Sequence, residues 1–322
     1  AEEIHALLNR PLADKDREAT VVLPGAMGSL LASIRGIGAL LWFNPTVLSN
    51  GHLNLLDLNQ EGMGDRSPDV EIIPVGIEKL TYLRLILTLA RESRLYEFPY
   101  DWRRHLEWNA NLLHQSLQRW SLPDPERRFT LIGHSLGGML ARTYLALYPQ
   151  EAERLLDRVI MLGSPLFGTA LTTLIFSDET PYAKVISLLH PNNDTLEFSI
   201  NLPTSYQLLP PPPELFPGDR PYPVNWDIYD SLAWGLPGVR QDYLDDARRL
   251  YELLSDSDPQ VEVIDIVGCH KRTLTDVWRA FDMGDGQQSS KPHYTLVNQE
   301  RGDDSGDGTV PLWSTHMDGV CR

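Results

Sequence analysis

The sequence has little cysteine, and too little positive charge to balance its acidic residues. Cys269 and Cys321 are its two cysteines, which excludes a fold held together by several disulfides. Lys and Arg total 28 against 44 Asp and Glu, so the formal net charge is −16. Nucleic acid is therefore not an expected partner, because its phosphate backbone needs a basic face. Electrostatic attachment to an anionic membrane is disfavoured for the same reason.

Several other signals are also missing. No apolar run approaches the roughly 20 residues that a membrane-spanning helix requires. No Cys/His cluster has metal-ligand spacing, and neither a P-loop nor a G-x-G-x-x-G motif occurs, so we predict no metal and no cofactor. The sequence begins with Ala1 and shows no signal peptide, which favours a cytoplasmic location over secretion.

What the sequence does contain is a G-x-S-x-G segment, Gly133 to Gly137, with Ser135 at its centre. An apolar strand pattern begins at Phe129 before it, and a helical pattern continues to about Tyr148 after it. This context predicts a nucleophile elbow, in which a serine lies at the apex of a strained strand-to-helix turn. Ser135 is then the nucleophile, and the Leu136 amide contributes to an oxyanion hole. The alternative is a Gly-rich turn that matches by chance.

An earlier strand pattern, Thr20 to Leu23, leads into a Gly-rich loop from Pro24 to Ser29. An oxyanion hole needs a second backbone N–H beside the nucleophile, and bulky neighbours would block it. We therefore predict that Ala26 donates this second amide. An ordinary strand-to-helix turn is the alternative, and the later elbow favours the functional interpretation.

The order of these patterns predicts an α/β-hydrolase fold, with a mostly parallel sheet flanked by helices and an inserted cap. We expect residues 1–170 and 258–322 to form the core, and residues 171–257 to form the cap. Between 171 and 257 the strand–helix alternation fails and prolines accumulate, including the run Pro210 to Pro213. Such a cap can shape an apolar acyl pocket, although a packing excursion without a binding role is the alternative. Near the end, Tyr294 to Val297 predicts a short extended segment.

A late acidic loop, residues 303–311, contains Asp307. We predict that Asp307 is the triad acid, because α/β-hydrolases present Ser before Asp along the chain. A calcium loop is the alternative, but its carboxylates are spaced more regularly. His316 is the candidate base, nine positions after Asp307. The fold normally places another helix and strand between acid and base. We therefore expect the sequence to stop before the usual histidine, with a base from elsewhere or no base as alternatives. His134, next to Ser135, is expected to be a packed neighbour.

Residues 34–48 are apolar but interrupted by Gly and Pro. They predict either contact with a lipid surface or core packing beneath a loop. The candidate contacts are Ile37, Leu40, Leu41, Trp42 and Phe43.

Six segments together resemble the lecithin:cholesterol acyltransferase family, which includes lysosomal phospholipase and phospholipid:diacylglycerol acyltransferase. The most specific are Tyr100-Asp101-Trp102-Arg103 and Gly306-Asp307-Gly308-Thr309-Val310-Pro311. The others are Pro24 to Ser29, Gly133 to Gly138, Gly163 to Pro165 with Gly168-Thr169, and Tyr206 to Pro210. In the Tyr100-Asp101-Trp102-Arg103 segment, Asp101 and Arg103 are expected to fix the following loop by charge-assisted hydrogen bonds rather than to act in catalysis.

The resemblance implies acyl-ester chemistry on lipids, by hydrolysis or by transfer to an alcohol. It implies Ser135 as nucleophile, Asp307 as acid, and Ala26 and Leu136 as oxyanion amides. Where secreted members hold a disulfide, this sequence has Asp265 and Asp318, which favours a reducing compartment. The predicted function is therefore a lipase, phospholipase or lipid acyltransferase. The alternative is a non-catalytic lipid-binding or regulatory module on a hydrolase scaffold.

Overall fold

The computed structural model describes residue 6 and residues 18–35, 38–176, 181–218, 220–284, 287–300 and 305–315. Its centre is a five-stranded parallel sheet in the order β5-β1-β6-β7-β8. The strands are β1 (Ala19–Leu23), β5 (Arg94–Glu97), β6 (Phe129–His134), β7 (Leu156–Leu162) and β8 (Glu262–Ile266). Because parallel strands end at one edge, the loops that follow them gather there.

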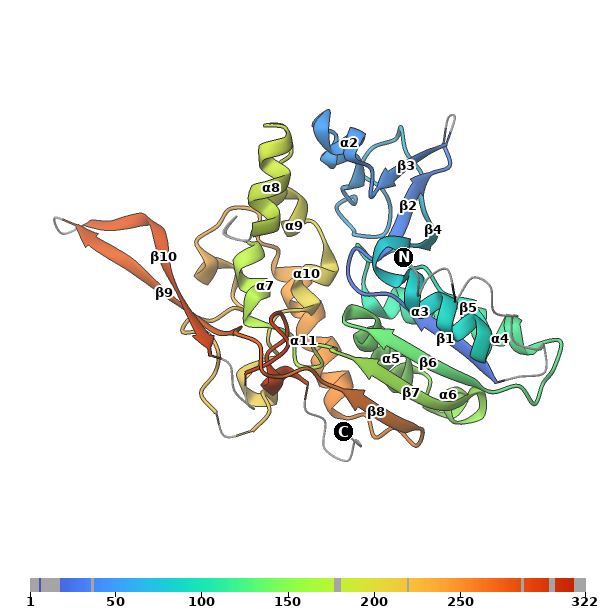
Figure 1. Ribbon diagram of the computed structural model, residues 1–322. Coiled ribbons are helices and arrows are strands. Elements are labelled where there is room, and N and C mark those ends of the chain that lie inside the picture. The colour runs from blue at the N-terminus through green and yellow to red at the C-terminus, as the bar shows by residue number, and fades with distance from the viewer. Residues whose placement is uncertain are drawn as a thin grey trace.

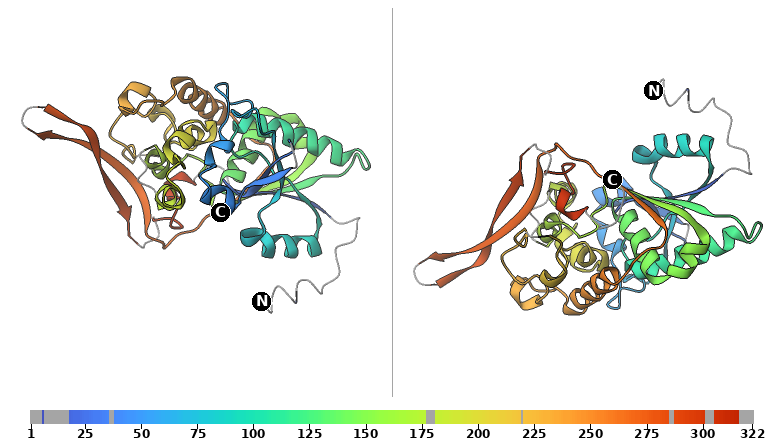
Figure 2. Two further views of the ribbon diagram at one scale, coloured as in Figure 1. Left: turned by 90° about the horizontal axis from the view of Figure 1, so that it is seen from above. Right: turned by 90° about the horizontal axis from the view of Figure 1, so that it is seen from below.

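The central strands are continuous apolar runs because helices cover both faces of the sheet. Every residue of β1 is buried, as is every residue of β6 before His134. Figure 2 shows α3 on one face, with α4 and α5 on the other. The helices here are α3 (Lys79–Glu92), α4 (Leu106–Ser121), α5 (Leu136–Leu147) and α6 (Pro149–Leu155). In α4 the buried positions Leu106, Ala110, Leu113 and Leu117 form one stripe toward the sheet.

A small antiparallel sheet follows β1 and rises above the central sheet (Figure 1). Its strands are β2 (Ser29–Ser33), β3 (Ala39–Trp42) and β4 (Ile72–Ile77), in the order β3-β2-β4. The helix α2 (Pro45–Ser49) and the 3-10 turn η1 (Leu53–Leu56) lie between β3 and β4 in the chain. The Pro24–Gly28 loop thus connects the two sheets directly.

Between β7 and β8 the described chain contains helices but no strand of these sheets. The helices are α7 (Ala170–Ile175), α8 (Pro181–Leu189), α9 (Thr195–Ile200), α10 (Pro203–Gln207) and α11 (Gln241–Ser255), with the 3-10 turns η2 (Pro213–Leu215) and η3 (Ser231–Trp234). Figure 1 shows α7 to α10 beyond the carboxyl ends of β6 and β7. An aromatic cluster that includes Phe176, Tyr206 and Trp234 forms a second hydrophobic core here. The exact domain boundaries stay a prediction.

A long antiparallel hairpin, β9 (Thr273–Gly284) and β10 (Gln287–Gln299), extends away from the body (Figures 1 and 2). The short extended segment expected at Tyr294 to Val297 was therefore an underestimate. The mostly polar β10 and the mixed sequence of β9 give no regular hydrophobic alternation, although the Asp285-Gly286 pair is a common hairpin turn sequence. A last 3-10 turn, η4, spans Leu312–Ser314. Within the described residues, no helix combines the length and apolarity needed to cross a membrane.

Candidate active site

Ser135 lies at the apex of the predicted strand–turn–helix, between β6 and α5. Its backbone has φ 51° and ψ −120°, an unusual conformation for a residue with a side chain. The Ser135 N–H donates to the Leu162 carbonyl at the end of β7 (2.9 Å), and its carbonyl accepts from the Gly138 N–H (2.9 Å). The side chain is half-buried. These bonds hold the serine in its strained geometry.

The glycines of the motif are required because neighbouring atoms leave no room for a Cβ. A Cβ on Gly133 would lie 2.6 Å from the Gly137 carbonyl oxygen, and one on Gly137 would lie 2.2 Å from the Leu23 carbonyl oxygen. A Cβ on Gly138 would lie 1.9 Å from Ser164 Oγ. Contacts below 3.0 Å force the backbone apart, so the close packing of α5 against the ends of β1 and β7 depends on glycine. The elbow is thus present as the sequence predicted.

The loop that carries Ala26 lies beside the elbow. A Cβ on Gly25 would lie 3.1 Å from the Ser135 Cβ, so the two segments are in contact. Ala26 is exposed in the turn after β1, and within the described part of the chain its N–H has no hydrogen-bond partner. Leu136 is the first residue of α5, where an N–H has no acceptor inside the helix. Both predicted amide donors therefore flank Ser135, and their catalytic role stays a prediction.

Four aromatic side chains fix this loop through their polar atoms. The bonds are Tyr100 Oη to the Pro24 carbonyl (2.7 Å), the Gly25 N–H to Tyr82 Oη (2.7 Å), Trp42 Nε1 to the Met27 carbonyl (2.9 Å) and Trp102 Nε1 to the Ser29 carbonyl (3.2 Å). They come from α3, from β3 and from the segment after β5. Sequence reasoning missed Tyr82, because nothing in a helical pattern shows which residue reaches a distant loop.

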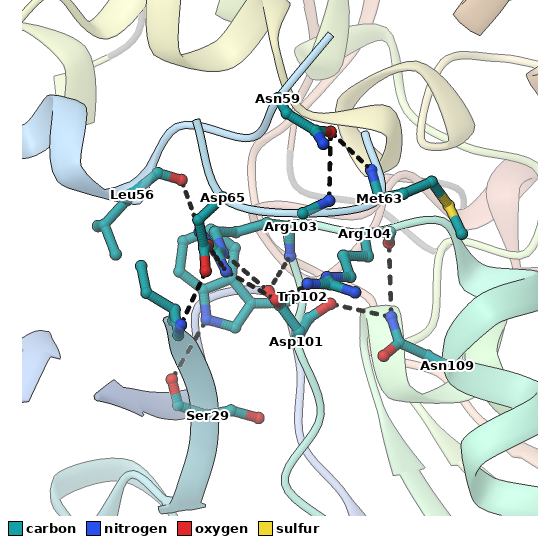
Figure 3. A network of polar contacts seen from close by, with 12 residues as sticks. Ser29, Leu56, Asn59, Met63, Asp65, Asp101, Trp102, Arg103, Arg104 and Asn109 are labelled. Carbon is teal, nitrogen blue, oxygen red and sulfur yellow. Dashed lines mark hydrogen bonds and ion pairs between the residues drawn. The ribbon is translucent and has the colours of Figure 1, made fainter. Parts of the chain in front are cut away.

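Behind this loop, Arg103 is fully buried in a network of acceptors, shown in Figure 3. Its Nε donates to Asp101 Oδ1 (2.9 Å), and its Nη2 donates to Asp101 Oδ2 (2.8 Å) and Asp65 Oδ1 (3.0 Å). Its Nη1 donates to the Leu56 carbonyl (2.8 Å). Burial alone would lower the pKa of Arg103, but the two carboxylates outweigh it and raise that pKa. The charge-assisted hydrogen bonds expected of Asp101 and Arg103 are present, and they join this segment to the Leu56 and Asp65 region; that neither residue acts in catalysis stays a prediction.

Asp307 lies at the same edge of the sheet as Ser135. A Cβ on Gly163, the residue after β7, would lie 3.0 Å from Asp307 Oδ2, and one on Gly268, shortly after β8, would lie 2.6 Å from Asp307 Cβ. Asp307 Oδ1 accepts from the N–H groups of Thr309 (2.8 Å) and Val310 (2.7 Å). One oxygen is thus held by its own loop, while the other points toward the strand next to the elbow.

Two further contacts fix the Asp307 loop to the start of β9. The Lys271 N–H donates to the Gly306 carbonyl (3.0 Å), and the Gly308 N–H donates to Thr273 Oγ1 (2.9 Å). In the part of the chain that the structure describes, no three His, Cys, Asp or Glu side chains come together as a metal site, while Asp303 and Asp304 of this loop lie outside that part. The structure therefore brings Ser135 and Asp307 together and leaves the acid role of Asp307 as a prediction.

The histidines divide into two cases. His316, the predicted base, lies outside the described residues, as do Ile37 and Asp318. His134 is half-buried, and its Nδ1 lies 2.7 Å from Tyr82 Oη. Burial lowers the pKa of His134, while the nearby Asp307 carboxylate partly raises it. With one ring nitrogen already engaged, His134 is the packed neighbour that the sequence predicted.

Backbone strain is concentrated at this edge of the sheet. Among the described residues, three other than glycine have a positive φ: Met27 (60°), Ser135 (51°) and His270 (62°). They lie in the loops after β1, β6 and β8, whose carboxyl ends meet at one edge. Such strain is typical of functional sites, where the surroundings hold a backbone that would otherwise relax.

The apolar stretch near β3 is divided between surface and core. Leu40 and Phe43 are 37% and 45% exposed, as lipid contact requires. Leu41 and Trp42 are only 4% and 6% exposed, so their predicted contact with lipid is wrong. Both belong to the main core, and Trp42 packs edge-on against Trp102 at 5.4 Å between ring centroids. Successive residues of a regular strand face opposite sides of the sheet. Here a register shift in the pairing of β2 with β3 leaves the neighbours Leu41 and Trp42 both buried.

Comparison with known proteins bears on both fold and family. Residues 88–233, which include the elbow, match the model of the lecithin:cholesterol acyltransferase family. This chain has an α/β-hydrolase fold. The predicted fold class is confirmed, and so is the resemblance to that family over the matched residues. A comparison with the sequences of curated proteins found no match.

Among solved structures, that of the Tle4–Tli4 complex is similar, with a TM-score of 0.57 and 14% identity over 94% of this chain and 89% of that chain. The mature lipase BlEst2 of Bacillus licheniformis has a TM-score of 0.38 and 14% identity over 81% of this chain and 69% of that one. Phospholipase PlaB of Legionella pneumophila has a TM-score of 0.34 and 13% identity over 88% and 51%. At 14% identity, the likeness to the Tle4–Tli4 structure concerns the fold alone.

Proposed function

We propose that the protein is a serine hydrolase or acyltransferase that acts on acyl esters of lipids. One observation carries this proposal: Ser135 is held in a strained turn that touches the Ala26 loop, with Asp307 at the same edge of the sheet. A purely structural serine would not need this backbone conformation, which the surrounding packing must stabilise. The match of residues 88–233 to a lipid acyltransferase family supports the lipid part of the proposal.

In the proposed mechanism, Ser135 Oγ attacks the ester carbonyl and a histidine takes its proton. The oxyanion that forms accepts hydrogen bonds from the Ala26 and Leu136 amides, and each such donor contributes roughly 3 kcal/mol of transition-state stabilisation. The protonated histidine then gives its proton to the departing alcohol, which leaves an acyl-enzyme. Water or a second alcohol releases the acyl group by the reverse sequence of steps.

Asp307 would hold the histidine through Oδ2, because Oδ1 already accepts two amides of its own loop. His316 is one candidate for the base, and a histidine beyond Arg322, which the usual order of the fold predicts, is the other. Its imidazole must bridge the space between Asp307 Oδ2 and Ser135 Oγ. His134 does not fit this role, since its Nδ1 contacts Tyr82.

The proposal also includes contact with a lipid surface through two neighbouring elements. The first is the end of β3, where Leu40 and Phe43, the residue that follows the strand, are exposed. The second is α8, where Val185, Leu188 and Leu189 are exposed at 59%, 84% and 47%. Asn193 joins α8 to α2, since its Nδ2 donates to the carbonyls of Leu48 (2.8 Å) and Ile186 (3.1 Å). Figure 1 shows α8 and α2 rising from the same side of the molecule. With a net charge of −16, this contact would depend on apolar insertion rather than on charge.

Hydrolysis of a short-chain nitrophenyl ester by protein with its complete natural C-terminus tests the proposal. We expect activity that Ser135→Ala abolishes, and that Asp307→Asn lowers by about 10⁴-fold because the histidine loses its orientation. The matched control is Ser121→Ala, which removes a buried hydroxyl from α4 and should leave the rate unchanged. Wild-type rates no higher than those of Ser135→Ala would favour the non-catalytic lipid-binding module instead.

A further inference from the structure

The Tyr82 hydroxyl occupies a position between the two segments that flank the candidate oxyanion site. It accepts the Gly25 N–H at 2.7 Å and lies 2.7 Å from His134 Nδ1. Gly25 precedes Ala26, and His134 precedes Ser135. One hydroxyl group therefore contacts the residue before the first predicted amide donor and the residue before the nucleophile.

The ring of Tyr82 is also closely packed against both segments. Tyr82 is 5% exposed, and its ring meets that of His134 edge-on at 5.6 Å between centroids. A Cβ on Gly28 would lie 3.1 Å from Tyr82 Cε2, so the ring touches the loop at a second point. Its helix is anchored to the same loop, because the Glu78 N–H donates to the Gly28 carbonyl (2.9 Å) at the start of α3. Tyr82 has little freedom to move away from either partner.

Counting protons favours one direction for the hydrogen bonds, because only a His134 that accepts at Nδ1 leaves the Tyr82 proton with a partner. The Gly25 N–H must donate, so the Tyr82 oxygen accepts there, and its single proton is free to point at His134 Nδ1. His134 then accepts at Nδ1 and carries its proton on Nε2. Burial favours this neutral imidazole by lowering the His134 pKa, and burial raises the pKa of Tyr82, which keeps its hydroxyl protonated. Each group in this series of hydrogen bonds, from Gly25 through Tyr82 to His134, thus has a partner.

We propose that Tyr82 is a positioning residue that holds the Ala26 amide in register with Ser135 through the Gly25–Tyr82–His134 hydrogen bonds. This inference rests on the proposed function of the same site. An oxyanion donor is effective only when it already lies where the negative charge will develop. Without the hydroxyl, the Gly25 N–H and His134 Nδ1 would both lose a buried partner, and the loop would be free to shift away from the elbow.

The test is Tyr82→Phe, assayed with the soluble nitrophenyl ester. We expect kcat to fall roughly ten- to hundred-fold with little change in KM, since a misplaced donor weakens binding of the transition state rather than of the substrate. The affinity for an alkyl boronic acid, which forms a tetrahedral adduct with the serine, should weaken by a similar factor. An uncharged ether with the same alkyl chain makes no adduct with the serine, so Tyr82→Phe and the wild type should bind it with the same affinity.

A matched control separates positioning from general loss of stability. Tyr229→Phe removes another buried hydroxyl, which donates to the Pro210 carbonyl at 2.9 Å and contacts neither Gly25 nor His134. It should lower the melting temperature about as much as Tyr82→Phe does, while kcat stays at the wild-type value. Equal losses of kcat in the two variants would overturn the positioning role.

A second pair of variants tests the same series of hydrogen bonds at His134. In His134→Asn, the amide Oδ1 takes the place of Nδ1 and can still accept from Tyr82, whereas His134→Leu has no acceptor. We expect the asparagine variant to keep most of the activity and the leucine variant to resemble Tyr82→Phe.

If wild-type protein is active, Ser135→Ala is inactive, and Tyr82→Phe matches wild type, the inference fails while the proposed function stands. If wild-type protein is no faster than Ser135→Ala, the proposed function itself fails.

Discussion

At the scale of single residues, Ser135 shows how the sequence stabilises a costly conformation. A non-glycine residue in such a backbone region costs of order 1–3 kcal/mol, which neighbouring contacts must offset. Gly133, Gly137 and Gly138 allow that packing, because a Cβ on any of them would lie within 2.6 Å of a neighbouring atom. Replacing any of these glycines would therefore separate the elbow from the strands that hold it.

Asp57 gives a residue-scale prediction about pH. Asp57 is 3% exposed, and burial raises the pKa of its carboxyl to about 6, although Arg66 at 3.0 Å opposes the shift. In the unfolded chain the group ionises near pH 4. Between about pH 4 and pH 6 the unfolded state therefore loses its proton first, and stability falls as pH rises, by up to about 3 kcal/mol.

The measurement for Asp57 is urea unfolding of the wild type and of Asp57→Asn at pH 4 and pH 8. The asparagine cannot ionise, so its stability relative to wild type should improve at the higher pH. Asp69→Asn, which removes an exposed carboxylate, controls for the general effect of losing one negative charge. A difference between Asp57→Asn and wild type that is the same at both pH values would contradict this account.

At the scale of elements, the sheet was far easier to predict from the sequence than its attachments. Apolar runs located the strands around Thr20 to Leu23 and from Phe129, because buried parallel strands have few polar residues. The β9–β10 hairpin was reduced to a short segment, because most residues of β10 are polar and β9 mixes apolar with charged residues. The hydrogen bond between Tyr82 and Gly25, which are 57 positions apart, could not be read from local patterns.

The helix α8 carries the prediction about lipid contact. Leu188 is 84% exposed on it, so Leu188→Glu should weaken binding to phosphatidylcholine vesicles by placing a charge in the apolar contact. Hydrolysis of the soluble nitrophenyl ester should not change. Leu122→Glu is the matched control, since Leu122 is 76% exposed at the end of α4, and it should leave vesicle binding intact. Equal binding by the Leu188 and Leu122 variants would remove α8 from the proposed surface.

At the scale of the whole molecule, the site is assembled from loops that are far apart in the chain. The Pro24–Ser29 loop follows β1, the elbow follows β6, and Asp307 packs on the residues after β7 and β8. Their common position follows from parallel strands that end at one edge. This is why the order of motifs in the sequence was enough to predict that Ser135, Ala26 and Asp307 would meet. Which aromatic side chains fix the loop depends on packing between layers, which the sequence does not display.

The most direct measurement is covalent labelling of the serine by a fluorophosphonate, followed by mass spectrometry of the digested protein. Such reagents react with a serine only when its oxygen is activated and the oxyanion site can accept the phosphoryl oxygen. Our account predicts that the label attaches to the peptide containing Ser135, and that unfolded protein and Ser135→Ala remain unlabelled. A native protein that takes up no label, or takes it up at another residue, would contradict the account.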